Sequence, residues 1–493
     1  MASPYAALED RFRRLSDIEG ALSILSWDQA VCMPKGGSET RGNQMATLRR
    51  LAHDALTAAE TGALLDEAAG EPGLDGWQAA NLREMRRRYV RATALDPALV
   101  EALTRATNAC EMTWRDAKAA SDFARLRPLL EEVVRLVREA AGQVGAKLGL
   151  SPYDALLDEN QPGLRNADVE RLFGPLRAVL PGMVEQAIGR QGDPVLPSGP
   201  FAVEKQRALG RRLVERAGFD FAHGRLDESA HPFCGGVPQD IRMTTRYRED
   251  EVASALMGIL HETGHALYEA GLPKRWLGQP VGEARGIAVH ESQSLLMEMQ
   301  ACRSPEFVRW LAGEFRATFG DDPAFDPDNL VRLYNRVERS LIRVEADEMT
   351  YPLHIVLRWQ LEQAMVAGDL AVADLPGAWN DGMRALVGIV PPDDRSGCLQ
   401  DIHWPVGGFG YFPSYTLGGM LAAQLFQAAE RELPELRGAI ARGDLTLLLG
   451  WVRDRVHAQG SQPTWTDLIV QATGAPLSPE PFLAHLRARY LGG

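Results

Sequence analysis

The chain has 493 residues, of which 45% are hydrophobic and 24% are charged, a composition typical of a folded globular protein. Its 53 Lys and Arg residues and 66 Asp and Glu residues give a formal net charge of −13 at pH 7. An acidic chain without a basic cluster lacks the electrostatic footprint of a nucleic-acid-binding protein and is repelled by anionic membrane surfaces. We therefore expect neither nucleic acid nor a membrane among its partners.

The cysteines and the first residues of the sequence bear on the cellular compartment of the protein. The five cysteines lie far apart, and an odd number of isolated thiols is a poor disulfide framework, which favours a reducing compartment. The first residues carry charges where a secretory signal needs an apolar stretch, and the sequence has no run of 18 apolar residues. These patterns predict a cytoplasmic protein.

Most segments carry apolar residues at spacings of three and four, and this spacing predicts a mainly helical chain. Segments 126–148 and 331–366 are clear examples. Stretches rich in Gly, Pro or Asp predict loops at 189–200, 320–328 and 391–397. We expect the first loop to separate an N-terminal helical lobe, 1–190, from a C-terminal lobe, 191–493, with one core shared between them.

One segment, 240–248, alternates apolar and polar side chains. Ile241 and Met243 point one way, whereas Arg242 and Thr244 point the other. A period of two predicts a short strand with one polar face. We expect an edge strand, which is able to pair with the backbone of an extended peptide.

The clearest chemical signal is the run HETGH at 261–265. Acidic residues at 249–251 and a mostly apolar run at 252–260 precede HETGH, and Gly271 follows it. Acidic residues at the beginning, apolar residues within and a glycine at the end are typical of a helix. Residues four apart share a helix face, so both imidazoles can reach one cation, and Glu262 stands beside a metal-bound water. The plainer interpretation is a buried helix with two incidentally spaced histidines.

A catalytic zinc takes three protein ligands and keeps a fourth position for water. His261 and His265 supply two ligands, and Glu291, 26 residues after His265, is the best candidate for the third. His290 points about 100° away from Glu291 around a helix, so the two do not ligate together. Glu298 follows two turns later on the same face, where it can orient a ligand. Without HETGH, a solvated carboxylate would be the default interpretation of Glu291.

Six motifs follow one another along the chain: HPF at 231–233, DIRMT at 240–244, HETGH at 261–265, HESQ at 290–293, IRVEAD at 342–347 and GCLQDIHW at 397–404. In this order, and over nearly its whole length, the sequence resembles the carboxypeptidase Taq family of HExxH zinc metallocarboxypeptidases. It departs from the family pattern at 294–299 and at 160–161. These departures leave the proposed ligands intact and bear on the contacts around them and on the dimer surface.

The resemblance implies a fold, a cofactor and a substrate class. The family is mainly α-helical, with a small β-sheet bordering a deep active-site groove, and forms homodimers. It implies one Zn²⁺ per chain, with Co²⁺ as a possible substitute, held here by His261, His265 and Glu291. The substrates are peptides with a free C-terminus, from which a single residue is removed.

Residues of the motifs match the steps of that reaction. Glu262 is the expected general base, which takes a proton from water and passes it to the leaving amine. The developing oxyanion needs hydrogen-bond donors in addition to the metal. Four candidates stay unranked: His231, His403, Tyr411 and Tyr415.

An exopeptidase also binds the free α-carboxylate of its substrate, for which the fork of an Arg side chain is suited. The resemblance favours Arg343, with Arg242 second. We expect Asp401 to orient His403 as a helper. The plainer interpretation of Arg343 is a salt bridge with Asp347, four residues later on a helix face.

Two other functions remain open from the sequence. An oligopeptidase or dipeptidyl carboxypeptidase on a similar helical scaffold would use the same metal site and release different products. A catalytically dead peptide-binding protein would keep the groove, but the intact Glu262 argues against it.

Overall fold

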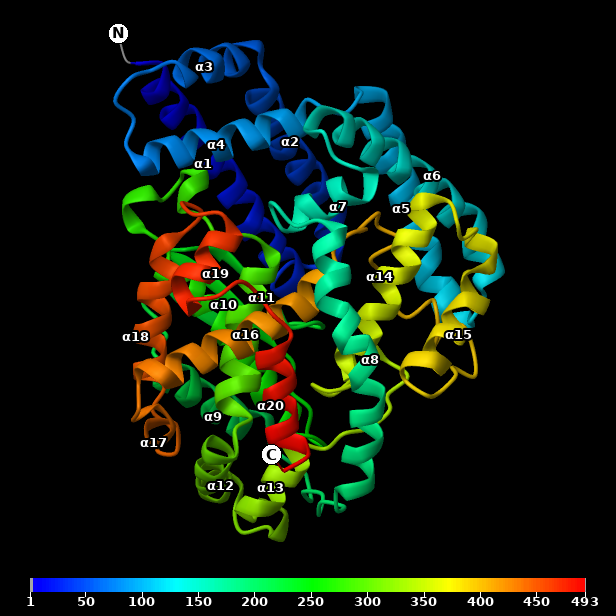
Figure 1. The fold of residues 1–493 in the computed structure, drawn as a ribbon, viewed down its shortest axis with the longest axis vertical. Helices are drawn as coiled ribbons and strands as arrows, with labels where there is room; N and C mark the ends of the chain where they lie inside the picture. Colours follow the sequence, from blue (N-terminus) through cyan, green and yellow to red (C-terminus); the bar gives the residue numbers. More distant parts are fainter. Residues whose placement is uncertain (1–2, 493) are drawn as a thin grey trace.

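The computed structural model describes residues 3–492, and helices make up most of it (Figure 1). The first half contains α1 (Pro4–Val31), α2 (Ser38–Thr57), α3 (Ala59–Ala69), α4 (Gly76–Ala92), α5 (Pro97–Ala120), α6 (Phe123–Leu148), α7 (Pro152–Asn160), α8 (Asn166–Arg190) and α9 (Val203–Arg216). The second half contains α10 (Ala253–Gly271), α11 (Ile287–Leu295), α12 (Pro305–Phe319), α13 (Pro327–Tyr334), α14 (Tyr351–Ala367), α15 (Leu375–Leu386), α16 (Pro413–Glu432), α17 (Leu436–Ile440), α18 (Thr446–Arg455), α19 (Trp465–Thr473) and α20 (Glu480–Tyr490). The prediction of a mainly helical fold is confirmed.

One large apolar cluster forms the main core. It extends from Cys110 to Leu486 and includes buried residues on both sides of residue 190. The chain segments before and after the predicted lobe boundary therefore share a core, and the boundary itself stays a prediction. No helix in the part of the chain that the structure describes has the length and apolar character needed to cross a membrane. All five cysteines are free thiols.

The first four helices have a smaller core of their own, at the top of Figure 1. Tyr5 and Leu8 of α1 pack with Leu65 of α3 and Met85 of α4. A buried amide ties this group to the rest of the molecule, because Asn81 of α4 donates to Gln279 Oε1 at 3.0 Å and accepts the backbone N–H of Val281 at 3.2 Å.

The helical pattern at 126–148 is confirmed by α6, whereas the helical pattern over 331–366 is confirmed only at its two ends. There α13 ends at Tyr334, α14 begins at Tyr351, and the segment between them is irregular. The Asp347 carboxylate accepts backbone N–H groups from Glu338, Met349 and Thr350 at 2.9 to 3.0 Å. A side chain that binds nearby backbone donors in this way competes with the helix for them.

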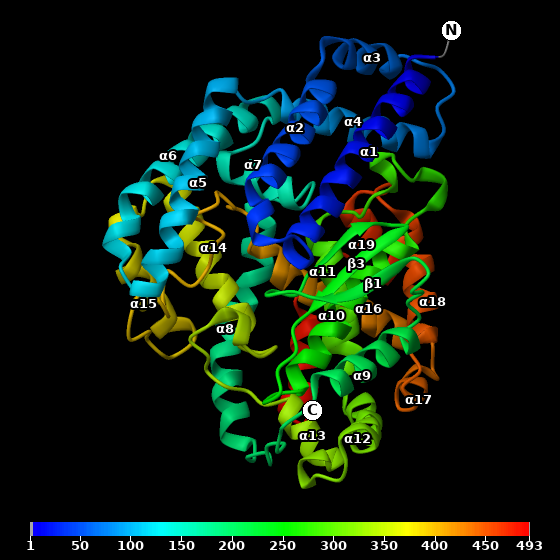
Figure 2. The same ribbon diagram turned by 180° about the vertical axis from the view of Figure 1, so that it is seen from behind.

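A three-stranded sheet lies beside α10 (Figure 2), with β1 (Gly224–Glu228), β2 (Cys234–Val237) and β3 (Asp240–Thr245) in the order β1-β3-β2. The strand predicted at 240–248 is confirmed as far as Thr245, and its expected edge position is wrong. β3 is central because β1 pairs with it in parallel and β2 pairs with it antiparallel on its other side. Ile241 and Met243 are fully buried in the main core, and Arg242 lies over the ring of Trp27 in α1.

The helices α10, α11 and α16 pack closely near the centre of the molecule. Gly264 of α10 allows the first contact, since a Cβ added there would lie 2.5 Å from the carbonyl oxygen of Gln293 and 2.6 Å from the Cα of Ser294. Such distances are well inside van der Waals contact, so only glycine lets α11 approach α10 this closely.

Candidate metal centre and active site

Two helices bring three predicted ligands together. His261 and His265 project from α10, Glu291 projects from α11, and one ligand atom of each lies within 4.8 Å of the other two. His265 Nε2 is 3.7 Å from Glu291 Oε2. Within residues 3–492 this is the one group of three such side chains with metal-binding geometry. His261 and Glu291 line a cavity of 470 Å³ together with Glu262.

Hydrogen bonds fix the orientation of both imidazoles. His261 Nδ1 lies 2.9 Å from Glu298 Oε2, and His265 Nδ1 lies 3.1 Å from the backbone carbonyl of His290. Both partners are acceptors, so each Nδ1 carries a proton, and Nε2 is the ring nitrogen that is left to bind a metal. This is how proteins orient histidine ligands of a metal.

Glu298 reaches His261 from a π-helical turn, Leu296–Cys302, that continues α11. Arg303 Nη2 donates to Glu298 Oε1 at 2.8 Å. Burial alone would raise the pKa of Glu298, but Arg303 and the bond from His261 outweigh it and hold the pKa below its usual value. Glu298 is therefore an ionised acceptor, which suits the orienting part predicted for it.

His290 contacts His265 and Glu269. Its Nδ1 lies 2.7 Å from His265 Nδ1, and its Nε2 lies 2.9 Å from Glu269 Oε1. Glu269 accepts the Nε2 proton, so His290 Nδ1 and the His290 carbonyl share the one Nδ1 proton of His265 as acceptors. The prediction that His290 and Glu291 point apart agrees with this arrangement.

The charges around the three residues favour a cation. Burial opposes a charge on His261, but Glu298 and Glu291 outweigh it and raise the pKa of His261 to about 10. Burial raises the pKa of Glu262 to about 7, and Glu291 and Glu298 add to the effect. Several carboxylates thus share one enclosed space, and a divalent cation would relieve their repulsion. Two imidazoles and a carboxylate are also a donor set of catalytic zinc, so the residues fit the implied metal.

Space for Glu291 comes from Gly418 of α16. A Cβ at this position would lie 2.8 Å from Glu291 Cβ and 2.7 Å from Glu291 Cγ. Any larger residue would push the carboxylate out of its present place. The position of Glu291 thus depends on a residue that is far away in the sequence.

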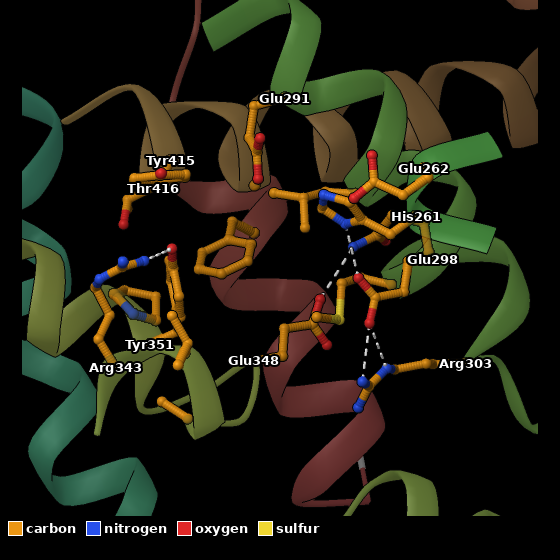
Figure 3. A pocket seen from close by; sticks show the side chains of 18 of the residues that line it. His261, Glu262, Glu291, Glu298, Arg303, Arg343, Glu348, Tyr351, Tyr415 and Thr416 are labelled. Carbon is orange, nitrogen blue, oxygen red and sulfur yellow. Dashed lines mark hydrogen bonds and ion pairs between the residues drawn. The ribbon is translucent and has the colours of Figure 1, made fainter. Parts of the chain in front are cut away.

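Arg343 faces the metal-binding residues across the cavity (Figure 3). Its Nε and Nη2 donate to Asp401 Oδ1 at 3.0 and 2.9 Å, and its Nη1 donates to the Tyr351 hydroxyl at 2.7 Å. A guanidinium has five N–H groups, so these three bonds leave two for a ligand. The side chain of Arg343 is only 7% exposed, which strengthens its interaction with any anion inside the cavity.

The alternative interpretation of Asp347 and the expectation for Asp401 are both wrong. Asp347 binds backbone N–H groups in the irregular segment, so it is not the salt-bridge partner of Arg343. Asp401 lies between Arg343 and Arg358, with Arg358 Nε at 2.7 Å from its Oδ2, and stands 4.0 Å from His403 Nδ1. Two buried arginines attract the carboxylate more strongly than one imidazole, and burial lowers the pKa of His403 to about 4.

The four candidates for the oxyanion donor occupy different places. Tyr415 lines the cavity, and its hydroxyl is 3.5 Å from His403 Nε2. Tyr411 lies near both, with its ring centroid 5.6 Å from that of His403 and 5.3 Å from that of Tyr415. His231 is exposed on a loop, and only its neighbour Pro232 lines the cavity.

Arg242 lies outside the cavity. Its Nε and Nη2 donate to the two oxygens of Asp240 at 2.6 Å each. The guanidinium lies 4.3 Å from the ring centroid of Trp27. This orientation turns Arg242 toward α1.

Comparison with known proteins places this geometry in a family. Residues 7–490 match the family model described as carboxypeptidase Taq (M32) metallopeptidase. The chain belongs to the carboxypeptidase Taq family. Thermostable carboxypeptidase 1 of Thermus thermophilus is 40% identical over 99% of both chains. Carboxypeptidase 1 of Bacillus subtilis is 34% identical over 98% of this chain and 97% of its own.

Solved structures of carboxypeptidase Taq family members share the whole fold. Trypanosoma cruzi metallocarboxypeptidase 1 superposes with a TM-score of 0.97 at 41% identity, and the match covers 99% of both chains. The M32 carboxypeptidase of Deinococcus radiodurans gives a TM-score of 0.94 at 37% identity, with 99% of this chain and 98% of that chain covered. The present chain is accordingly a metallocarboxypeptidase, a peptide hydrolase.

Replacing Gly418 with Ala tests whether Glu291 belongs to the metal site. We expect Gly418→Ala to weaken metal affinity about 10- to 100-fold, the range found when a residue that positions a ligand is changed. Gly419→Ala is the matched control in the same helix, because its added Cβ meets Leu295 Cδ1 at an ordinary 3.7 Å. Competition with a fluorescent chelator measures both affinities. Equal affinities would contradict a ligand role for Glu291.

Proposed function

We propose that this metallocarboxypeptidase binds one Zn²⁺ per chain through His261 Nε2, His265 Nε2 and a Glu291 oxygen, and removes single residues from peptide C-termini. The convergence of these atoms opposite Arg343 in one cavity is the observation that carries the proposal. Co²⁺ prefers a similar set of nitrogen and oxygen ligands and is expected to substitute.

Bound zinc would supply Lewis acidity and lower the pKa of a coordinated water to about 7. Glu262 stands one residue from His261 on α10 and is buried with 7% of its surface exposed. Its carboxylate takes a proton from the attacking water and delivers it to the nitrogen of the leaving residue. The buried environment favours the protonated carboxyl, so Glu262 is suited to hold this proton between the two transfers.

Tyr415 is the proposed donor to the oxyanion that develops on the scissile carbonyl. It is the one of the four candidates whose side chain lines the cavity within the described chain. Burial, with Tyr351 and Tyr411 close by, raises the pKa of Tyr415, so its hydroxyl keeps its proton and remains a donor. Tyr411 lies close to Tyr415 and His403 and is proposed to hold the Tyr415 side chain in position.

Arg343 is the proposed anchor for the α-carboxylate of the substrate. Its two remaining N–H groups match a carboxylate, and Asp401 together with Tyr351 holds the guanidinium in place. Binding the carboxylate at a fixed distance from the metal selects which peptide bond meets Glu262. This selection distinguishes an exopeptidase from the oligopeptidase or dipeptidyl alternative, which would seat its substrate further along the cavity.

We also propose a cytoplasmic homodimer. Five free thiols support a reducing compartment, and likeness to the family supports the dimer. Sedimentation of the purified enzyme at micromolar concentration tests the assembly, and a single species of 54.1 kDa would contradict it.

Glu262→Gln separates proton transfer from metal binding. The amide keeps the size of the side chain but is unable to accept a proton, so we expect kcat to fall by about 100-fold or more while the metal content is unchanged. Peptide hydrolysis and elemental analysis of the same sample give the two readouts. Loss of the metal in this variant would show that Glu262 is a ligand instead.

Arg343→Lys and Arg242→Lys form a matched pair, because both arginines bind an aspartate through Nε and Nη2. We expect Arg343→Lys to lower kcat/KM about 10- to 100-fold on a peptide with a free C-terminus, since the fork is lost. Arg242→Lys is expected to retain activity. Thermal unfolding of both variants controls for their stability.

The same peptide with an amidated C-terminus completes this test. The wild-type enzyme is expected to cleave the amidated peptide far more slowly than the free acid. In Arg343→Lys, the ratio of the two cleavage rates is expected to be smaller. Mass spectra of timed products identify what is released. Dipeptides, or equal cleavage of acid and amide, would contradict the proposed anchoring.

A further inference from the structure

Three polar side chains of α14 lie at intervals of seven and four residues: Tyr351, Arg358 and Glu362. These intervals are close to two turns and one turn of a helix, so the three side chains share one face of α14. Tyr351 binds Arg343 Nη1 (Figure 3), and the other two bind the segment 397–412, which precedes α16. This face of α14 therefore contacts both the proposed carboxylate anchor and the segment that holds it.

Arg358 reaches Asp401 from the interior of the protein. The side chain of Arg358 has no exposed surface, and it is not among the residues that line the active-site cavity. Its Nε donates to Asp401 Oδ2 at 2.7 Å, and its Nη1 donates to the His354 carbonyl at 2.9 Å. The guanidinium carbon lies 4.6 Å from the ring centroid of Trp379. Arg358 is thus held on three sides and does not reach a substrate in the cavity.

Asp401 binds its two arginines through different oxygens. Arg343 Nε and Nη2 both donate to Oδ1, at 3.0 and 2.9 Å, whereas Oδ2 accepts from Arg358. Asp240 binds a single arginine and gives one oxygen to each of two donors, Arg242 Nε and Nη2. An aspartate that offers both oxygens to one arginine forms the stronger, fork-like pair. Arg358 therefore keeps Asp401 from forming such a pair with Arg343.

The shared carboxylate leaves Arg343 only partly neutralised. Burial alone would raise the pKa of Asp401, but Arg358 and then Arg343 outweigh it and hold the pKa well below its usual range. One negative charge thus lies between two positive ones. His354 and His403 are neutral near pH 7, because burial lowers the pKa of His354 to about 3 and that of His403 to about 4.

We propose that Arg358 is a positioning residue for the α-carboxylate of the substrate. By occupying Asp401 Oδ2, it keeps the Arg343 guanidinium directed into the cavity and available to a second carboxylate. A substrate then meets a guanidinium that is already fixed, so little side-chain freedom is lost on binding. This inference rests on the proposed role of Arg343 as the anchor.

Arg358→Met tests this role, because methionine is a long apolar side chain that offers Asp401 no donor. We expect KM for a free-acid peptide to rise about tenfold, as on loss of one charge-assisted hydrogen bond, with kcat little changed. The preference for the free acid over the amidated peptide is expected to shrink by the same factor. Arg358→Gln, a smaller neutral replacement, is expected to act in the same way, whereas Arg358→Lys keeps a charge beside Oδ2 and is expected to restore most of the binding.

Glu362→Gln is the matched control in the same helix. Glu362 is fully buried one turn beyond Arg358, and it holds the same segment by accepting Trp404 Nε1 at 2.9 Å and the Gly410 N–H at 3.1 Å. An amide in its place loses one of these acceptors, so we expect a lower unfolding temperature. KM for the free acid is expected to be unchanged, because Asp401 keeps both of its arginines.

The crystal structure of Arg358→Met gives a readout that is independent of activity. We expect Asp401 to turn and to bind Arg343 through both oxygens, as Asp240 binds Arg242. A wild-type KM in Arg358→Met, an unchanged Arg343–Asp401 geometry, or an equal rise of KM in Glu362→Gln would overturn the proposal. Equal cleavage of the acid and the amide by the wild-type enzyme would instead contradict anchoring by Arg343 itself, so the two failures are distinguishable.

Discussion

Close packing of α11 against both α10 and α16 is the constraint on which the active site depends. Glu291 meets the two histidines only because Gly264 lets α11 touch α10 and Gly418 leaves room for the Glu291 side chain. A ligand supplied by a separate helix is only as well positioned as the contact between the helices. The dense core around them limits any relaxation of that contact.

The cavity separates two kinds of charge. Carboxylates gather on the wall formed by α10 and α11, and Arg343 lies on the opposite wall (Figure 3). A peptide C-terminus carries its negative charge at the end and its scissile carbonyl one residue away. In the proposed binding mode, the two walls would orient such a substrate before any bond breaks, which would lower the entropic cost of the reaction.

The sequence predicts the three side chains that converge at the candidate metal site, because the spacing of the two histidines is a local property. The interval of four between His261 and His265 places both on one face of α10, and the motif order identifies Glu291. Arg343 also belongs to one of the motifs, but its ion-pair partner cannot be predicted from that motif. Asp401 is 58 residues away, and the side-chain contacts of Asp347, which is only four residues away, are instead with the backbone.

Other features depend on contacts that one sequence does not reveal. Glu298 reaches His261 from a π-helical turn, and the motifs give no sign of Arg303 behind it. Tyr351 belongs to no motif, although it follows the IRVEAD segment closely enough to be a candidate. The central position of β3 depends on β1, whose sequence is too short and polar for its pairing to be predicted.

Anomalous diffraction at the zinc absorption edge from crystals of the zinc-loaded enzyme is the most direct test. The account predicts one zinc per chain, bound by His261 Nε2, His265 Nε2 and a Glu291 oxygen at about 2.0 to 2.2 Å. Zinc bound without Glu291, or in the cavity at any other set of residues, would contradict it.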